Sequence, residues 1–268
     1  TDGRIATARA LGSELYGTNG DAALPANAKV GVLYTQTDDG IAIKAGVEVE
    51  ARQWGKNDDF IYSSFSASDI PSLTTAISNF QTQGVQAIIV ASNQVPFKAA
   101  IGALNTQGMT APVFTSYVNA DPTAVDVNTD YAFDIYTNAW LDVTAPENAT
   151  DVADFVAAIN GSSDIPENDK AAMSANAFAI AGYVAAKMFI QGLERVGTDE
   201  LTWESFIKAM ESAPVSVPMG GAVNFADGMR LGISEMALLK YQVTTVGEVK
   251  VAQFIKQYDI ENLENLRG

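Results

Sequence analysis

Four short apolar segments decide the fold of this chain: KVGVLYT (29–35), DFIYSSF (59–65), QAIIVA (86–91) and PVFTSY (112–117). The first is a near-continuous apolar run, which is typical of a strand buried on both faces of a parallel sheet. Helical patterns separate the four segments. Residues 29–117 therefore predict an alternating order of strands and helices, which is the pattern of a doubly wound α/β domain.

The helical patterns carry clear start and stop signals. Asp69 and Pro71 are suited to the cap and first turn of a helix, and Gly84 is suited to its end. Apolar residues recur there at helical spacing: Leu73, Ile77 and Phe80. The same spacing predicts a helix that carries Phe97, Ile101 and Leu104 and stops at Gly108, and a further helix is predicted over Ile41–Trp54.

A predicted helix, Asp2–Tyr16, comes before the first strand. In a doubly wound domain each helix connects two parallel strands, so a start on a helix is unusual. We therefore expect the chain to begin in the middle of a fold, so that its function must be inferred from half of a binding cleft.

The second half of the chain changes character near Leu141. A fifth strand is predicted at Ala132–Trp140, and turn-rich stretches then separate three helices. A short β region follows, in which Gly247 joins two strands in a hairpin. The predicted helices are Asp151–Asn160, Ala171–Arg195 and Thr202–Ser212, and the predicted strands are Gly220–Phe225, Glu235–Val243 and Glu248–Phe254.

The composition excludes several classes of function. The 268 residues carry a net charge of −16 and contain neither cysteine nor histidine. The negative charge argues against nucleic-acid and anionic-lipid partners, because both need clustered Lys and Arg. The missing residue types remove disulfides, thiolate nucleophiles, Cys/His zinc sites and the commonest general base. No run of roughly 18 apolar residues is present that could span a bilayer.

The searched motifs for catalysis and cofactors are also missing. The sequence has no Gly-x-Ser-x-Gly elbow, no dinucleotide fingerprint after a strand and no phosphate-binding loop. Asp38 and Asp39 are adjacent acids, which in a loop are usually solvated. Asp126, Asn128 and Asp130 lack the glycine and the distal glutamate of a calcium loop. We therefore predict no catalytic residue, no cofactor and no metal.

Polar loops follow the predicted parallel strands at 36–40, 66–69, 92–95 and 118–121. In an open parallel sheet, ligands bind beyond the carboxyl ends of the strands. The alternative is that these loops only close the sheet. We predict ligand contacts at this edge from eight residues: Thr37, Asp38, Asp39, Ser92, Asn93, Gln94, Tyr117 and Asn119.

The order of these pieces resembles a known family, the periplasmic substrate-binding proteins of ABC importers of the leucine/isoleucine/valine-binding type. Three stretches carry the resemblance: KVGVLYTQTDDG (29–40), AFAIAGYVAAKMFIQGLERVG (177–197) and GGAVNFADGMRLGISEMALLKY (220–241). It extends over nearly the whole chain, including the long central stretch 64–122.

The resemblance implies a fold of two Rossmann-like lobes joined by crossovers. Residues 1–145 and 233–255 would form the second, ligand-binding lobe. Residues 148–230 would be the helical return segment of the first lobe, whose opening strand–helix units are missing, and residues 256–268 would be a C-terminal tail.

The resemblance also implies a ligand held between the lobes. The family's second lobe usually contributes two tyrosines and an acidic residue, and at these places the chain carries Asp39, Gln94 and Tyr117 instead. We expect Tyr117 to form a stacking or cation–π wall, and Asn93 and Gln94 to act as paired donors and acceptors. Asp39 would be the only charge opposite a cationic group. The alternative is that Asp38 and Asp39 only cap the helix near Ile41.

The resulting hypothesis is a non-catalytic, extracytoplasmic solute-binding protein of an ABC importer. Its ligand would be an amino acid or a related polar compound, with amides, aromatic acids and nucleobase-like compounds as open alternatives, and its partner would be a membrane permease. The alternative is a ligand-sensing regulator or receptor domain of the same fold. The apolar faces of 171–195, through Phe178, Met188 and Phe189, should cover a sheet that this chain lacks. The fragment is thus expected to dimerise, swap elements or retain its first lobe.

Overall fold

The computed structural model describes residues 1–12, 24, 27–174, 176–230, 232–233, 235–247 and 249–267. The chain divides into two compact units. We call Thr1–Ala139 with Met236–Gly268 the sheet unit, and Trp140–Glu235 the helical unit.

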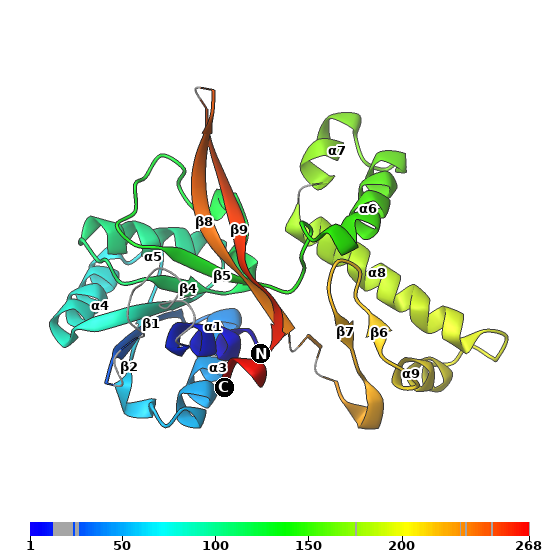
Figure 1. Cartoon of the computed structure of the whole chain (residues 1–268), viewed down its shortest axis with the longest axis horizontal. Coiled ribbons are helices and arrows are strands. Elements are labelled where there is room, and N and C mark those ends of the chain that lie inside the picture. Colours follow the sequence, from blue (N-terminus) through cyan, green and yellow to red (C-terminus); the bar gives the residue numbers. More distant parts are fainter. Residues whose placement is uncertain are drawn as a thin grey trace. The chain divides into compact units, whose positions relative to one another are not determined.

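The sheet unit is built on a seven-stranded sheet with the order β2-β1-β3-β4-β5-β8-β9 (Figure 1). The first five strands run parallel, and β8 is antiparallel to β5. This confirms the predicted α/β class with a mainly parallel sheet. The strands are β1 (Lys29–Thr35), β2 (Phe60–Phe65), β3 (Val85–Ala91), β4 (Val113–Thr115), β5 (Ile135–Ala139), β8 (Glu235–Val246) and β9 (Val249–Asn262).

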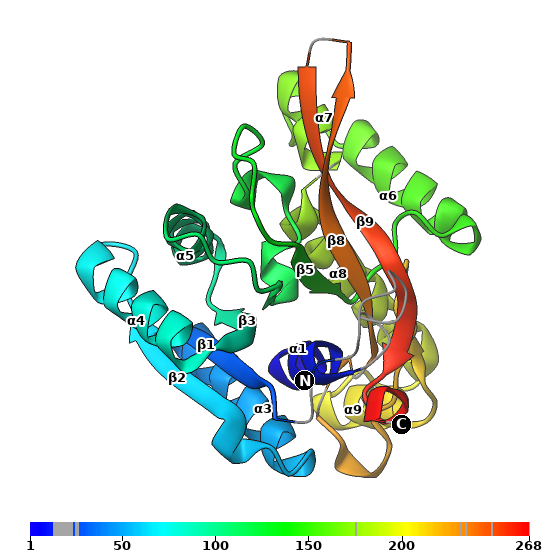
Figure 2. The ribbon, with the colours of Figure 1, turned by 60° about the vertical axis from the view of Figure 1, so that its left-hand side comes forward.

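Helices cover both faces of this sheet (Figure 2). On β3, Ile88 and Val90 face one hydrophobic cluster, whereas Ala87 and Ile89 face the other. This alternation follows from the two-residue period of a strand and explains why residues 87–91 of β3 are all apolar. The covering helices are α1 (Asp2–Leu11), α3 (Asp38–Gln53), α4 (Ile70–Gln83) and α5 (Gln94–Thr106).

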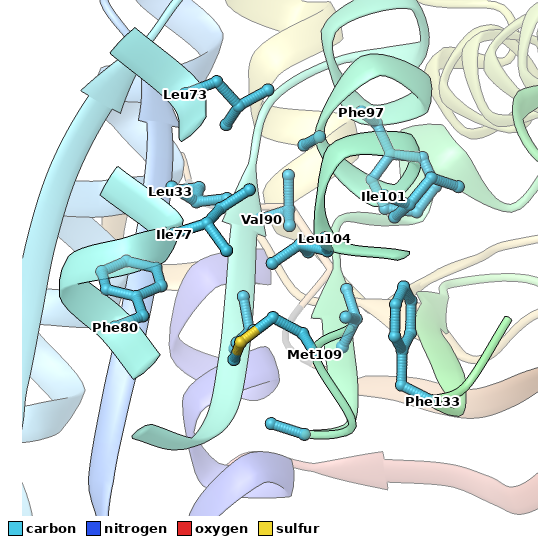
Figure 3. Close-up of a cluster of buried hydrophobic side chains, with 14 of the residues drawn as sticks. Leu33, Leu73, Ile77, Phe80, Val90, Phe97, Ile101, Leu104, Met109 and Phe133 are labelled. Atoms are coloured by element: carbon cyan, nitrogen blue, oxygen red, sulfur yellow. The ribbon is translucent and has the colours of Figure 1, made fainter. Parts of the chain in front are cut away.

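The cluster under α4 and α5 contains the apolar faces predicted from helical spacing (Figure 3). All six of those side chains are fully buried: Leu73, Ile77, Phe80, Phe97, Ile101 and Leu104. The predicted signals of α4 are confirmed as well, because Asp69 Oδ1 accepts a hydrogen bond from the Ser72 N–H at 3.1 Å. Gly84 ends the helix in the left-handed conformation, with φ of 69°.

The helical unit has its own small core around Phe155, Val184 and Met219. Gly192 lets α8 and α9 pack closely, because a Cβ there would lie 2.5 Å from the Phe206 ring. Two short strands pair antiparallel beside the helices. The elements are α6 (Ala149–Gly161), α7 (Glu167–Ser174), α8 (Ala177–Val196), α9 (Trp203–Glu211), β6 (Val215–Ser216) and β7 (Ala222–Val223).

The predicted single helix over 171–195 is wrong. The segment belongs to two helices, α7 and α8. Asn176 caps α8, because its Oδ1 accepts hydrogen bonds from the N–H groups of Phe178 at 2.9 Å and Ala179 at 3.0 Å. An asparagine side chain that satisfies first-turn donors favours a helix start over a helix interior.

Other boundaries differ by a few residues. α3 begins at Asp38, three residues before the predicted start, and β4 ends at Thr115. The predicted helix Asp2–Tyr16 is seen as Asp2–Leu11, and 13–16 lie outside the described residues. The stretch 256–268, expected to be a tail, begins inside β9, which runs to Asn262. β6 was not predicted, because a strand of two residues is too short to show an alternation of apolar and polar residues.

The apolar surface of the helical unit follows the sequence only in part. Phe178 and Phe189 are 65% and 54% exposed, whereas Met188 packs against the unit's core. Trp203 of α9 is 73% exposed. No single helix in the described ranges is long and apolar enough to cross a membrane, although α7 and α8, bent against each other, reach that length and composition together.

Candidate functional site

The eight predicted contact residues follow three strands that are neighbours in the sheet. Thr37, Asp38 and Asp39 follow β1, the run 92–94 follows β3, and Tyr117 and Asn119 follow β4. Because these strands are parallel, their carboxyl ends share one edge of the sheet. The sheet unit therefore brings the predicted residues to a common edge, and their role as ligand contacts remains a prediction.

Asn119 ties the loops after β3 and β4 together. Its Nδ2 donates hydrogen bonds to the Ser92 carbonyl oxygen at 2.9 Å and to Thr115 Oγ1 at 2.7 Å, and the residue is fully buried. Gln94 Nε2 reaches the Val118 carbonyl oxygen at 3.3 Å. These bonds between loops give the edge a fixed shape, so Asn119 has a structural task whether or not it meets a ligand.

Asp38 and Asp39 both lie in the first turn of α3, where negative charge complements the helix dipole. Neither is the capping residue, which is Thr37, and the Thr37 hydroxyl hydrogen-bonds to Thr35 Oγ1 at 2.7 Å instead of to the helix. Gly40 allows this turn to approach the strand ends, because a Cβ there would lie 3.0 Å from the Ala91 carbonyl oxygen. The alternative that Asp38 and Asp39 cap the helix with their side chains is therefore wrong, and their interaction with the helix dipole remains.

The structure adds Asp2, which the sequence did not indicate as a site residue. Its Oδ1 accepts hydrogen bonds from Asn138 Nδ2 at 2.7 Å and from the Tyr117 N–H at 3.4 Å. Burial raises the pKa of this carboxyl group, and the bonds from Asn138, Ser116 and Tyr117 oppose that rise. Asp2 thus adds a third carboxyl group to those of Asp38 and Asp39 at this edge.

Tyr117 stands beside this carboxylate. It begins a single 3-10 turn, Tyr117–Asn119, and is 40% exposed. Burial raises the pKa of its phenol, and the charge of Asp2 raises it further. An aromatic ring that is partly exposed next to a carboxylate is a suitable wall for a cationic group.

Four buried side-chain atoms at this edge have no hydrogen-bond partner among the described residues: Asp2 Oδ2, Asp39 Oδ2, Ser92 Oγ and Asn119 Oδ1. Buried polar atoms are normally paired, and leaving one unpaired costs about 1–3 kcal/mol. Three of the four are oxygens of carboxylate or amide groups, which accept hydrogen bonds. An amide oxygen or an ionised carboxylate cannot donate one. The edge is therefore suited to a partner that brings several donors.

Within the part of the chain that the structure describes, no three carboxylates are grouped to hold a metal ion. A compound with N–H donors matches the unpaired oxygens of this edge chemically.

Comparison with known proteins identifies the family. Residues 5–247 match the model of a family described as periplasmic binding protein. This match spans most of the chain, so the chain belongs to the periplasmic binding protein family. No curated protein sequence matches the chain.

Solved structures of ABC transporter substrate-binding proteins share the fold. A fatty acid ABC transporter substrate-binding protein from Thermomonospora curvata has 17% identity and a TM-score of 0.68 over 98% of this chain and 64% of that chain. A leucine binding protein from Thermotoga maritima has 12% identity and a TM-score of 0.64 over 98% of this chain and 67% of that chain.

A third structure of the same fold holds a ligand. It is a branched chain amino acid ABC transporter from Thermus thermophilus with bound valine, with 14% identity and a TM-score of 0.61 over 90% of this chain and 62% of that chain. The present chain thus spans 64% of the length of the fatty acid protein and 62% of that of the valine complex.

Proposed function

We propose that this chain is the larger part of an extracytoplasmic solute-binding protein of an ABC importer, and that it binds a small polar ligand with an ammonium group without transforming it. The observation that carries the proposal is the group of unpaired buried oxygens at the carboxyl edge of the sheet. An ammonium group offers three donors and a positive charge, and such charge-assisted bonds contribute about 1.5–3 kcal/mol.

Five residues at the edge have a role in this proposal. Asp2 and Asp39 accept from the ammonium group, with Tyr117 as the wall beside it. Gln94 and Asn93 orient the neutral part of the ligand. Amino acids carry the required ammonium group, and two similar structures are described as a leucine binding protein and as a complex with valine.

The two units correspond in this proposal to different lobes of the family fold. The sheet unit would be the second lobe, and the helical unit would be a segment of the first. Closure of two lobes on a ligand would provide the signal that a membrane permease reads. The exposed aromatic side chains of α8 and α9 would pack against the rest of the first lobe, or against a second copy or a swapped element when that lobe is missing.

A calorimetric screen tests the proposal. Amino acids, their amides and nucleosides would be titrated into the protein. We expect binding of one or more compounds that carry a primary ammonium group, weakened tenfold or more by Asp39→Asn and by Asp2→Asn. Asp58→Asn is the matched control, because Asp58 precedes β2 and so lies at the opposite edge of the sheet. Failure of every compound to bind below millimolar concentration would count against the proposal.

A further inference from the structure

The sheet unit contains a concave feature at the carboxyl ends of β1 and β2, next to the residues described above. It is a cleft of about 540 Å³ between the loops that follow β1 and β2, closed on a third side by Pro96 of α5. This volume lies within the range of about 300–1,000 Å³ that is usual for small-molecule sites. All the residues that line it belong to the sheet unit, so its shape does not depend on the helical unit.

Hydroxyl groups dominate the lining of this cleft. Six side chains contribute them: Thr35, Thr37, Ser64, Ser66, Ser68 and Ser72. Several already interact with a neighbour, such as Thr35 with Thr37 at 2.7 Å and Ser66 with Ser68 at 2.9 Å. A hydroxyl has one donor and two acceptor positions, so each pair keeps capacity for a further partner.

The cleft has acidic residues around it and no basic residue in its lining. Asp69 is the only ionisable residue in its lining, and no lysine or arginine contributes. Asp69 Oδ1 is engaged with the Ser72 N–H at the start of α4. Asp38 and Asp39 begin the helix that follows Thr37. An anion would find no cation here and several negative charges, so a neutral ligand group suits the cleft better.

Of the other lining residues, Gln36 is a polar amide whose Nε2 donates a hydrogen bond to Ser64 Oγ at 3.1 Å, and Phe65, Ala67 and Pro96 are apolar. A ligand that presents hydroxyl groups on one side and C–H groups on the other would match both parts of the wall. We infer that this cleft binds a neutral polyhydroxylated group, either of an acyclic polyol or of a sugar. The inference touches the proposed function only at Thr37, which borders both sites.

The test is a titration of the ¹⁵N-labelled chain with mannitol, myo-inositol and glucose, followed by amide resonances. We expect saturable shifts of the amide resonances at Ser66–Asp69. A stronger response to mannitol would indicate an acyclic polyol, and a stronger response to glucose would indicate a sugar, with myo-inositol as a ring compound that is not a sugar. The double variant Ser66→Ala/Ser68→Ala should weaken binding about tenfold, because two hydrogen-bonding groups are lost. Ser78→Ala is the control on α4, since Ser78 bonds to Gln107 and does not line the cleft.

Two results would overturn the inference: no shift at Ser66–Asp69 with any of these compounds at tens of millimolar, or a stronger response to inorganic phosphate than to the polyols. A parallel titration with leucine separates the two proposals. Shifts near Tyr117 with leucine but none at Ser66–Asp69 with polyols would leave the proposed function standing and remove this site. Shifts at Ser66–Asp69 with polyols but none near Tyr117 with leucine would support this site and count against the proposed function.

Discussion

The two units of this protein leave different kinds of group without a partner. In the sheet unit the apolar faces of α4 and α5 are fully buried, while carboxylate and amide oxygens at one edge lack hydrogen-bond donors. In the helical unit the imbalance is reversed, because Phe178, Phe189 and Trp203 are more than half exposed. We propose that the first unit binds a polar small molecule and that the second packs against an apolar protein surface.

The difference predicts that the same substitution has unequal effects in the two units. Phe97→Ala removes a fully buried ring and should lower the free energy of unfolding by about 3–5 kcal/mol. Phe178→Ala removes a ring that is 65% exposed and should cost less than about 1 kcal/mol. Chemical denaturation measures both. Equal losses of stability in the two variants would contradict the difference between the buried apolar face of α5 and the exposed apolar face of α8.

A second prediction concerns association. If the exposed aromatic residues are an unfilled contact surface, the chain should self-associate, and Phe178→Ser/Trp203→Ser should weaken that association at least tenfold in sedimentation experiments. Val95→Ser is the control, because Val95 is 74% exposed on α5 of the sheet unit. A wild-type chain that stays monomeric at all concentrations would contradict this account of the helical unit.

Loss of a helix cap should lower the stability by a similar amount in both units. Such a result would show that the local structure is fully formed in each unit. Asp69 caps α4, and Thr202 caps α9 by accepting from the Ser205 N–H at 3.1 Å. Replacement of either residue by alanine should cost about 1 kcal/mol of stability. A negligible loss for Thr202→Ala alone would indicate that the helical unit is not fully folded in this chain.

The pH dependence of stability tests the buried carboxyl group of Asp2 directly. The folded-state pKa of Asp2 is raised by burial, so its carboxyl group stabilises the fold in its protonated form. That contribution is complete below the unfolded value of about 3.9 and is lost as the pH rises through the folded pKa. Asp2→Asn cannot ionise. The stability of the wild type relative to this variant should therefore fall with rising pH, and a difference that is constant or rises with pH would be contrary to this picture.

Local signals explain which parts were predictable from the sequence. The face of Leu73, Ile77 and Phe80 and the cap at Asp69 depend on neighbours within one helix, and the structure confirms them. Sheet polarity followed from the alternation of strands and helices. The split between α7 and α8 was missed because Asn176 is equally compatible with a helix interior until its capping bonds are seen.

The sequence predicted which edge of the sheet carries the candidate site, but it did not predict how the side chains at that edge pair with one another. Strand order places Thr37, Ser92 and Tyr117 after neighbouring strands, which the chain order indicated. Asp2 was missed because its partner Asn138 lies 136 residues away in sequence, so no local pattern marks it. The bonds of Asn119 to Ser92 and Thr115 depend in the same way on how two loops meet.

The central claim is that the carboxyl edge of the sheet accepts an ammonium group. The most direct test is a titration of the ¹⁵N-labelled chain with leucine and, separately, with N-acetyl-leucine, which has the same side chain but no ammonium group. The account predicts shifts of the Asp39 and Tyr117 amides with leucine, and shifts at least tenfold weaker with N-acetyl-leucine or in the Asp2→Asn/Asp39→Asn variant. Equal responses to the two compounds, or no response to leucine at tens of millimolar, would contradict it.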